Sequence, residues 1–354
     1  MVKRARAHLA RGEWDYLTGA AETETSLKRN RLAFDRLALK ARVLLHDVSQ
    51  VQTRGSLLGV DLRIPVILAP IGSLQVFEAG GGLSVARAAE AFGVIQMLSS
   101  ACAPDFETVA RESRGPKMYQ FYSHGDEAQL MDIAGRTEAA GYAALCLTVD
   151  TQVYSRRERD MLKRYIPLSG TRVDEAQRPS EPSGLQPSFS WELVDRIKQR
   201  LSIPFVLKGI ACAEDAEIAV QHGVDVVYVS NHGGRQLDQG RASLEVLPEV
   251  VQAVRGRATV VVDGGILRGT DVLKALALGA DAVGIGRLEG LAMAAGGADA
   301  VVRMLEILEN EMRINLALMG LSSIDQLRSD SVLPAEPVVR PHVLSGFPLL
   351  DEGY

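Results

Sequence analysis

Cysteine is scarce in this 354-residue chain, which contains only Cys102, Cys146 and Cys212. The three do not follow metal-binding spacing, and an odd, sparse set fits a reducing compartment better than a disulfide framework. The first six residues are basic, but Leu9 to Tyr16 is mixed and polar, unlike the apolar core of a signal peptide. We therefore expect a cytoplasmic protein with no disulfide framework and no metal centre.

Long apolar runs and a strong charge imbalance are also missing. No apolar run reaches the ~20 residues that a membrane-spanning helix needs. Lys and Arg total 39 against 44 for Asp and Glu, so the net charge is only −5. Such a chain offers no strongly basic surface for nucleic acid or for an anionic membrane. We expect neither as a partner.

The chain does contain a regular alternation of apolar runs and Ala-rich segments with helical period. Eight runs fit buried parallel strands, near residues 65–69, 94–98, 117–122, 144–149, 203–208, 226–230, 259–263 and 282–286. Helical segments such as Leu83–Phe92 and Thr270–Leu278 lie between most of them. Eight strand-and-helix units predict an α/β fold of the (β/α)8 TIM-barrel type rather than an open doubly wound sheet.

Additions to this barrel are expected at both ends and at one internal position. The pattern predicts a helical N-terminal extension over residues 1–64, the barrel over 65–321 and a tail over 322–354. Residues 162–190, after the fourth strand, hold four Pro and five Ser and show no strong period. A long irregular segment placed after a strand is typical of a lid or a mobile loop.

Polar and small residues occur where the predicted strands end, which is where barrels of this type place their chemistry. The most informative stretch is Ser230–Asp238, SNHGGRQLD, which follows a strand. It combines a possible proton acceptor, His232, with a fixed cation, Arg235. That pair suits a substrate that has a proton to lose and a carboxylate to be held.

Two glycine-rich turns end the last two predicted strands. They are Asp263-Gly264-Gly265 and Ile285-Gly286-Arg287. Barrels often build a phosphate site from backbone N–H groups at these late strands. A tight turn would explain either triplet alone, but the two together with a nearby cation favour a phosphate-bearing cofactor.

These motifs resemble those of the FMN-dependent 2-hydroxy-acid oxidase and dehydrogenase family, which includes glycolate oxidase, lactate oxidase and mandelate dehydrogenase. The resemblance runs from about Asp15 to Leu321 and identifies residues 1–354 as one domain of this type. It rests on the stretches Asp15–Glu22, Leu68–Pro70, Leu98–Ser100, Gln120–Tyr122, Leu147–Thr151, Arg156–Asp160, Leu207–Gly209, Ser230–Asp238, Asp263–Gly265, Gly269–Asp271, Lys274–Ala280 and Ile285–Arg287.

The resemblance implies oxidation of an (S)-2-hydroxy acid to the 2-keto acid, with flavin N5 of FMN as the electron acceptor. His232 would be the base, and Asp150 would pair with it and raise its basicity. Arg157 and Arg235 would clamp the substrate carboxylate. Hydrogen bonds to the substrate would come from Tyr16 and Tyr122. The order in which proton and electrons leave the substrate stays open.

The resemblance also implies which residues would bind FMN. Lys208 would stabilise the reduced flavin, the backbone at Gly72 would approach N5, and Ser99, Gln120 and Thr148 would contact the ring edge. The ribityl chain and phosphate would be held by Ser230, Asp263, Gly264, Gly265, Gly286 and Arg287. A homotetramer or octamer is implied as well.

Three positions depart from the family pattern. Leu267 stands where an arginine normally reaches the phosphate, with Arg268 or Arg287 as possible substitutes. Ala101 replaces the tryptophan of glycolate oxidases, and Gly72 replaces a common alanine. The two small residues predict a large or aromatic, mandelate-like substrate.

Two alternatives stay open. The enzyme could pass its electrons to a quinone or a carrier protein rather than to oxygen. Leu267 also suggests a barrel that binds a phosphorylated ligand without redox activity, although the intact set around His232 argues against it.

Overall fold

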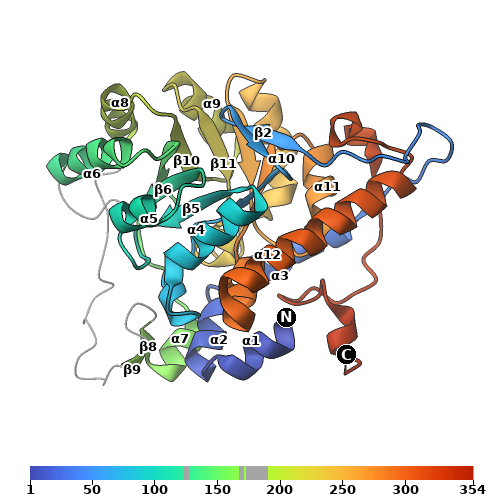
Figure 1. Ribbon diagram of the computed structural model, residues 1–354, viewed down its shortest axis with the longest axis horizontal. Helices are drawn as coiled ribbons and strands as arrows, with labels where there is room; N and C mark the ends of the chain where they lie inside the picture. The colour runs from blue at the N-terminus through green and yellow to red at the C-terminus, as the bar shows by residue number, and fades with distance from the viewer. Residues whose placement is uncertain (123–126, 167–170, 173–189, 354) are drawn as a thin grey trace.

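Figure 1 shows the computed structural model, in which helices surround a barrel of strands. The structure describes residues 1–122, 127–166, 171–172 and 190–353. The barrel is closed and its neighbouring strands are parallel, in the order β10-β11-β12-β13-β4-β5-β6-β7. The strands are β4 (Val66–Leu68), β5 (Ile95–Ser99), β6 (Lys117–Phe121), β7 (Ala144–Thr148), β10 (Phe205–Ile210), β11 (Val226–Val229), β12 (Thr259–Val262) and β13 (Ala282–Ile285). Each overlaps a predicted run, so the predicted barrel is confirmed.

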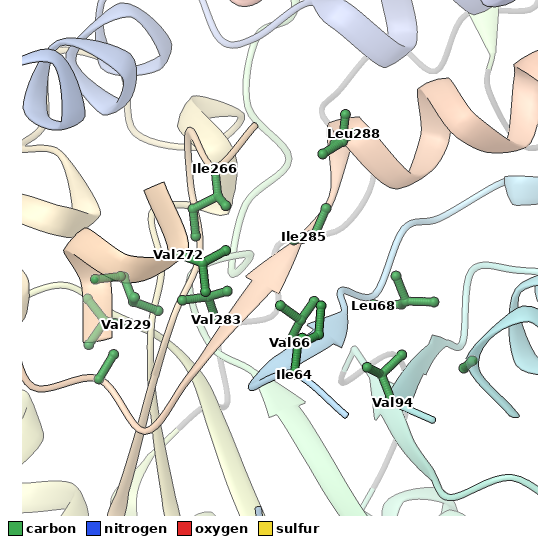
Figure 2. Packing of buried hydrophobic residues seen from close by; sticks show 14 of the residues in the cluster. Ile64, Val66, Leu68, Val94, Val229, Ile266, Val272, Val283, Ile285 and Leu288 are labelled. Carbon is green, nitrogen blue, oxygen red and sulfur yellow. The ribbon is translucent and has the colours of Figure 1, made fainter. Parts of the chain in front are cut away.

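The strands are apolar on both faces because both faces are covered. Along β5, Ile95 and Met97 belong to the cluster inside the barrel, while Leu98 belongs to the cluster between strands and helices. Figure 2 shows part of this outer layer, where Val283 of β13 lies toward Val272 of a surrounding helix. Successive side chains on a strand point to opposite faces, so the continuous apolar runs fill both layers.

The helices around the barrel are α4 (Gly81–Phe92), α5 (Phe106–Glu112), α6 (Glu127–Ala139), α8 (Trp191–Arg200), α9 (Ala213–Gln221), α10 (Ser243–Val254), α11 (Gly269–Ala277) and α12 (Arg287–Leu318). Two of them begin at side-chain caps. Asp105 accepts the N–H of Thr108 at the start of α5, and Ser190 accepts that of Leu193 at the start of α8. Such caps satisfy N–H groups that a helix start otherwise leaves unpaired.

The N-terminal extension is helical only in its first part. It begins with α1 (Val2–His8), α2 (Arg11–Thr18) and α3 (Thr25–Asp35), and continues with β1 (Leu37–Leu39) and a hairpin of β2 (Gly55–Leu57) and β3 (Val60–Leu62). The expectation of a helical segment up to residue 64 is therefore wrong for its second half. Leu57 and Leu62 join the cluster inside the barrel. The backbone N–H of Arg63, just after the hairpin, donates a hydrogen bond to the carbonyl of Gly93, just before β5. The hairpin therefore lies at the amino-terminal ends of the strands.

The predicted lid over residues 162–190 lies largely outside the described residues. Its described parts are the end of α7 (Glu158–Lys163), the short pair β8 (Tyr165–Ile166) and β9 (Thr171–Arg172), and Ser190. In the tail, β14 (Val332–Pro334) pairs with β1, and the chain then returns to the N-terminal helices, where Lys3 donates to the carbonyl of Gly353. Among the described residues, no helix is both long and apolar enough to cross a membrane.

Candidate active site

The predicted site residues meet at the carboxyl-terminal ends of the barrel strands. Lys208 on β10 is in register with Thr148 on β7, and Ser99 on β5 with Gln120 on β6. The segments after β7, β11 and β12 add Asp150, His232 and Asp263 to the same rim, and Arg287 joins them as the first residue of α12, directly after β13. Parallel strands direct all their carboxyl ends to one side, which is why residues so far apart in sequence converge.

His232 and Asp150 form a hydrogen-bonded pair. Nδ1 of His232 lies 3.0 Å from Oδ1 of Asp150. Because an ionised carboxylate can only accept, Nδ1 carries the proton and Nε2 is left as the basic nitrogen. Two backbone features allow the contact. His232 has a positive φ of 58°. Gly209 has a φ of 113°, and a Cβ added there would lie only 2.8 Å from the Cβ of Asp150, so a side chain at 209 would clash.

Burial and charge set the protonation of this pair. Burial lowers the pKa of His232 below its ordinary value, and the Asp150 carboxylate opposes that effect without cancelling it. Burial alone would raise the pKa of Asp150, but His232 and Lys208 outweigh it and the pKa is lowered. A neutral imidazole beside a carboxylate is the state that a general base requires. The Asp150 carboxylate thus raises the pKa of His232, although the net pKa stays below the ordinary value.

Lys208 is a fixed, buried cation next to this pair. Its Nζ donates to Ser230 Oγ at 2.8 Å and lies 3.2 Å from Oδ2 of Asp263. Ser230 in turn donates to Asp263 and accepts the backbone N–H of His232. Burial would lower the pKa of Lys208, but the carboxylates of Asp263 and Asp150 raise it above the ordinary value. The ammonium group therefore stays charged at neutral pH.

Two further cations lie close to the histidine: Arg157, which is buried, and Arg235, which is partly buried. Arg235 donates through Nη1 to the carbonyls of Tyr16 and Gly19, and its guanidinium lies 4.7 Å from the Tyr16 ring centroid. Burial lowers the pKa of Arg235, and the charge of Arg157 lowers it further. Nη2 of Arg235 and Nε of Arg157 are buried without a hydrogen-bond partner among the described residues. The arrangement is suited to binding an anion such as a carboxylate.

Tyr154 is a site residue that sequence reasoning missed. Its hydroxyl accepts a 2.6 Å hydrogen bond from Nη1 of Arg157, whose guanidinium lies 4.2 Å from the Tyr154 ring centroid. Tyr154 is 50% exposed, and desolvation of its hydroxyl raises the pKa of the phenol, which stays neutral. Its only signal in the sequence is a position three residues before Arg157. Asp160, also missed, is buried nearby, and burial raises its pKa against the opposing effect of Arg235.

Two tyrosines and two small residues make the adjoining walls. The Tyr122 ring stacks on His232 with centroids 6.4 Å apart, and burial raises the pKa of its hydroxyl. Tyr16 donates to the carbonyl of Gly72 at 3.1 Å. A Cβ added at Gly72 would lie 3.2 Å from the Cβ of Ala101 and 3.4 Å from Tyr16 Oη. Gly72 and Ala101 therefore face each other, and together they contribute only the methyl group of Ala101 to this wall.

The side chains predicted to meet a flavin ring fit such a group. Both amide atoms of Gln120 and the hydroxyl of Thr148 are buried without a hydrogen-bond partner among the described residues. Buried polar atoms left unpaired are costly, and a flavin edge presents the alternating donors and acceptors that would pair with them. Ser99 is also buried and accepts the N–H of Ala101. The donor set is therefore consistent with the isoalloxazine edge.

The predicted phosphate end contains one uncompensated cation. Arg287 donates to the carbonyls of Gly233 and Gly19, both at 2.8 Å, while its Nε is buried without a partner among the described residues. Burial lowers the pKa of Arg287 to about 9, and the nearby Arg235 lowers it as well. Binding of a phosphate would relieve this penalty, since a nearby anion favours the charged form.

The neighbouring Arg268 does not serve this end. Its Nη2 lies 2.6 Å from Glu311 and its Nη1 donates to the carbonyl of Gly346. Leu267 is buried, with only 4% of its surface exposed. Arg268 and Arg287 are the two possible substitutes for an arginine at 267. Arg287 lies at the predicted phosphate end, whereas Arg268 is directed away from it, toward Glu311 and Gly346.

Comparisons with known proteins agree with this geometry. Residues 5–334 match the family model described as FMN-dependent dehydrogenase. An L-lactate oxidase from Nostoc sp. is 38% identical over 343 residues, covering 91% of this chain and 94% of that protein. The peroxisomal (S)-2-hydroxyacid oxidase GLO3 of Arabidopsis thaliana is 38% identical over 344 residues, covering 93% of each.

Solved structures give the same result. Mandelate oxidase with 3,3-difluoro-2-hydroxy-3-phenylpropionic acid superposes with a TM-score of 0.85 at 37% identity, covering 95% of this chain and 98% of that one. A mandelate oxidase mutant with a C4a-OH-FMN adduct has a TM-score of 0.84 at 36% identity, covering 96% and 99%.

Proposed function

The chain belongs to the FMN-dependent dehydrogenase family of 2-hydroxy-acid oxidases, and on this premise we propose that it oxidises a large or aromatic (S)-2-hydroxy acid to the 2-keto acid. The observation that carries the proposal is the hydrogen-bonded pair of His232 and Asp150, which lies beside the guanidinium groups of Arg157 and Arg235. Bound FMN supplies the acceptor for the electron pair that leaves the substrate.

The substrate is held and deprotonated by residues of this chain. Arg157 and Arg235 bind its carboxylate, which would accept hydrogen bonds from guanidinium nitrogens that have no partner among the described residues. Nε2 of His232 then takes the proton, and Asp150 stabilises the imidazolium that forms. The phenol groups of Tyr16 and Tyr122 hold the carboxylate and hydroxyl of the substrate by hydrogen bonds.

The remaining residues of the rim are assigned to FMN. Ser99, Gln120 and Thr148 would bind the ring edge, the backbone at Gly72 would lie next to the ring, and the charge of Lys208 would favour the negative charge that the ring gains on reduction. Ser230, Asp263, Gly264, Gly265, Gly286 and Arg287 hold the ribityl chain and the phosphate. We assign these roles to one domain over residues 1–354, in a cytoplasmic homotetramer or octamer that uses oxygen or another electron acceptor.

The colour and reactivity of the purified protein test this function. We expect a yellow protein whose absorption band in the blue bleaches when a 2-hydroxy acid is added without oxygen. Oxygen uptake on re-aeration would assign an oxidase, whereas re-oxidation only by a quinone or carrier protein would assign a dehydrogenase. A colourless protein that binds phosphorylated ligands would refute the redox function.

Arg287 provides a test of the phosphate end. We expect Arg287→Met to raise the dissociation constant of FMN by about 10- to 100-fold, because a hydrogen bond to a charged group contributes roughly 1.5–3 kcal/mol. Fluorescence titration of the apoenzyme measures it. Arg303→Met is the matched control, since Arg303 lies on the same helix, is exposed and pairs with Glu306. Equal affinities in both variants would contradict the assignment.

Substrate size is the second property to test. Glycine at 72 and alanine at 101 are smaller than the residues common in this family, so we expect room for more than a two-carbon acid, and each buried CH₂ of a larger acid adds about 0.8 kcal/mol. We expect a higher kcat/KM for mandelate or long aliphatic 2-hydroxy acids than for glycolate or lactate, and Ala101→Trp should reverse that order. Glu112→Trp, at an exposed position, is the control. A wild-type preference for glycolate would show that another residue closes the space.

A further inference from the structure

Residues 343–347 of the C-terminal tail, here called the C-terminal strap, lie against two segments that flank the phosphate end of the site. At one end Val343 is only 7% exposed and packs in a separate small cluster with Ala20 and Leu27. Leu344 packs against this cluster and against the main core. The strap is therefore held by apolar contacts rather than lying free on the surface.

At its other end the strap covers Leu267. A Cβ added at Gly346 would lie 2.9 Å from both Cβ and Cδ1 of Leu267, so the strap backbone is in direct contact with this side chain. Arg268 reinforces the contact by donating to the carbonyl of Gly346 at 3.1 Å. An arginine at 267 would have to share this space with the strap. Leu267 thus provides an apolar surface on which the strap packs.

The first attachment point adjoins the backbone around Arg287, and the second lies close in sequence to the glycine turn assigned to the phosphate. Next to Ala20 in the sequence, Gly19 accepts a hydrogen bond from Arg287. The N–H of Ala21 donates to Gly234. A Cβ added at Gly234 would lie 2.5 Å from the backbone nitrogen of Leu27. On the other side, Leu267 follows the Gly264-Gly265 turn by two residues. The strap therefore connects the two sides of the proposed phosphate site.

The middle of the strap carries a polar atom with no role in the fold. The hydroxyl of Ser345 is buried and has no hydrogen-bond partner among the described residues. Its backbone N–H is used, because it donates to the carbonyl of His342. A buried hydroxyl without a hydrogen-bond partner is energetically unfavourable. A ligand at this position would satisfy it.

We propose that the C-terminal strap completes the FMN phosphate site, with the Ser345 hydroxyl donating a hydrogen bond to the phosphate where Leu267 supplies no cation. The inference rests on the proposed function, since it requires FMN as the ligand. In this chain, Leu267 holds the strap in place and the strap supplies the hydrogen bond to the phosphate. An arginine at 267 without the strap would be another way to bind the phosphate.

The experiment compares FMN with riboflavin, which lacks the phosphate. Apoenzyme is titrated with each flavin, and binding is followed by the change in flavin fluorescence. We expect Ser345→Ala to raise the dissociation constant of FMN about tenfold, as for a lost hydrogen bond to a charged group, and to leave that of riboflavin within about twofold. Ser329→Ala, in an exposed part of the tail, is the matched control.

A second variant tests the strap as a unit. Gly346→Val places a side chain against Leu267 and should displace the strap. The affinity for FMN should then fall more than the affinity for riboflavin. Thermal unfolding of each apoenzyme shows whether the variant is folded. In the wild type, FMN should protect the tail against carboxypeptidase more than riboflavin does.

The outcomes separate this inference from the proposed function. Unchanged FMN affinity in Ser345→Ala, or an equal loss for both flavins, overturns the phosphate contact while leaving the FMN enzyme intact. A wild-type protein that binds neither flavin overturns the proposed function and the strap together. A selective loss of FMN affinity in both variants, with the Ser329→Ala control unchanged, supports the strap.

Discussion

Replacing His232 with asparagine is expected to leave FMN bound and to abolish reduction of the flavin by substrate. Asparagine cannot accept the substrate proton, and loss of a general base costs about 10²- to 10⁴-fold in rate. His232 is expected to act through Nε2, because Nδ1 is engaged by Asp150 at 3.0 Å. Anaerobic mixing with substrate, followed by flavin absorbance, measures the rate of reduction.

A matched control for this variant exists in the same chain. His222 also places Nδ1 against a carboxylate, 2.7 Å from Asp195, but it stacks on Trp191 of α8 and lies on the outside of the barrel. In the His222→Asn variant, substrate should reduce the flavin at the wild-type rate. Rapid bleaching by the His232→Asn protein would remove His232 from the role of base.

Replacing Asp150 with asparagine is expected to slow flavin reduction by about 10²- to 10⁴-fold. The carboxylate raises the pKa of His232, so its loss makes the imidazole a weaker base. An amide can also donate to Nδ1, which would place the ring proton on Nε2, where the substrate proton must go. The measurement is the same anaerobic reduction, with Asp195→Asn as the control. A wild-type rate in Asp150→Asn would contradict the pairing.

The pH profile gives a second readout of the same pair. Burial holds the pKa of His232 below its ordinary value of about 6.5, so the basic form is present at neutral pH. The kcat/KM of the wild type should fall only as pH drops through that lowered pKa. In Asp150→Asn the acid limb should move to still lower pH while the plateau falls. An acid limb that moves upward would show that another group titrates.

The barrel and the members of its rim could be predicted from the sequence because both depend on local patterns. Runs such as Val226–Val229, buried throughout, need only their apolar length to be recognised as strands. One general rule, that parallel strands end on one side, then brings His232, Lys208 and Arg287 together. The helices α4 and α11 follow in the same way from their 3.6-residue period.

The hairpin over residues 55–62 and the attachment of the tail could not be predicted, because they depend on contacts between segments far apart in sequence. Leu57 and Leu62 are only two apolar residues in a short stretch, and their role appears when they fill the amino-terminal end of the barrel. Likewise, the sequence does not show that Gly346 covers Leu267, 79 positions earlier, or that Arg268 turns to Glu311.

The sequence by itself determined the fold, the family and the types of side chain available for catalysis, because these follow from patterns within single elements. Only the tertiary structure decided how those side chains are tuned. The basicity of His232 depends on burial outweighing one carboxylate, and the charge of Lys208 on two carboxylates outweighing burial. The contact of Tyr154 with Arg157 depends on the path of one loop. Burial and distance are properties of the packed chain, and no short stretch of sequence contains them.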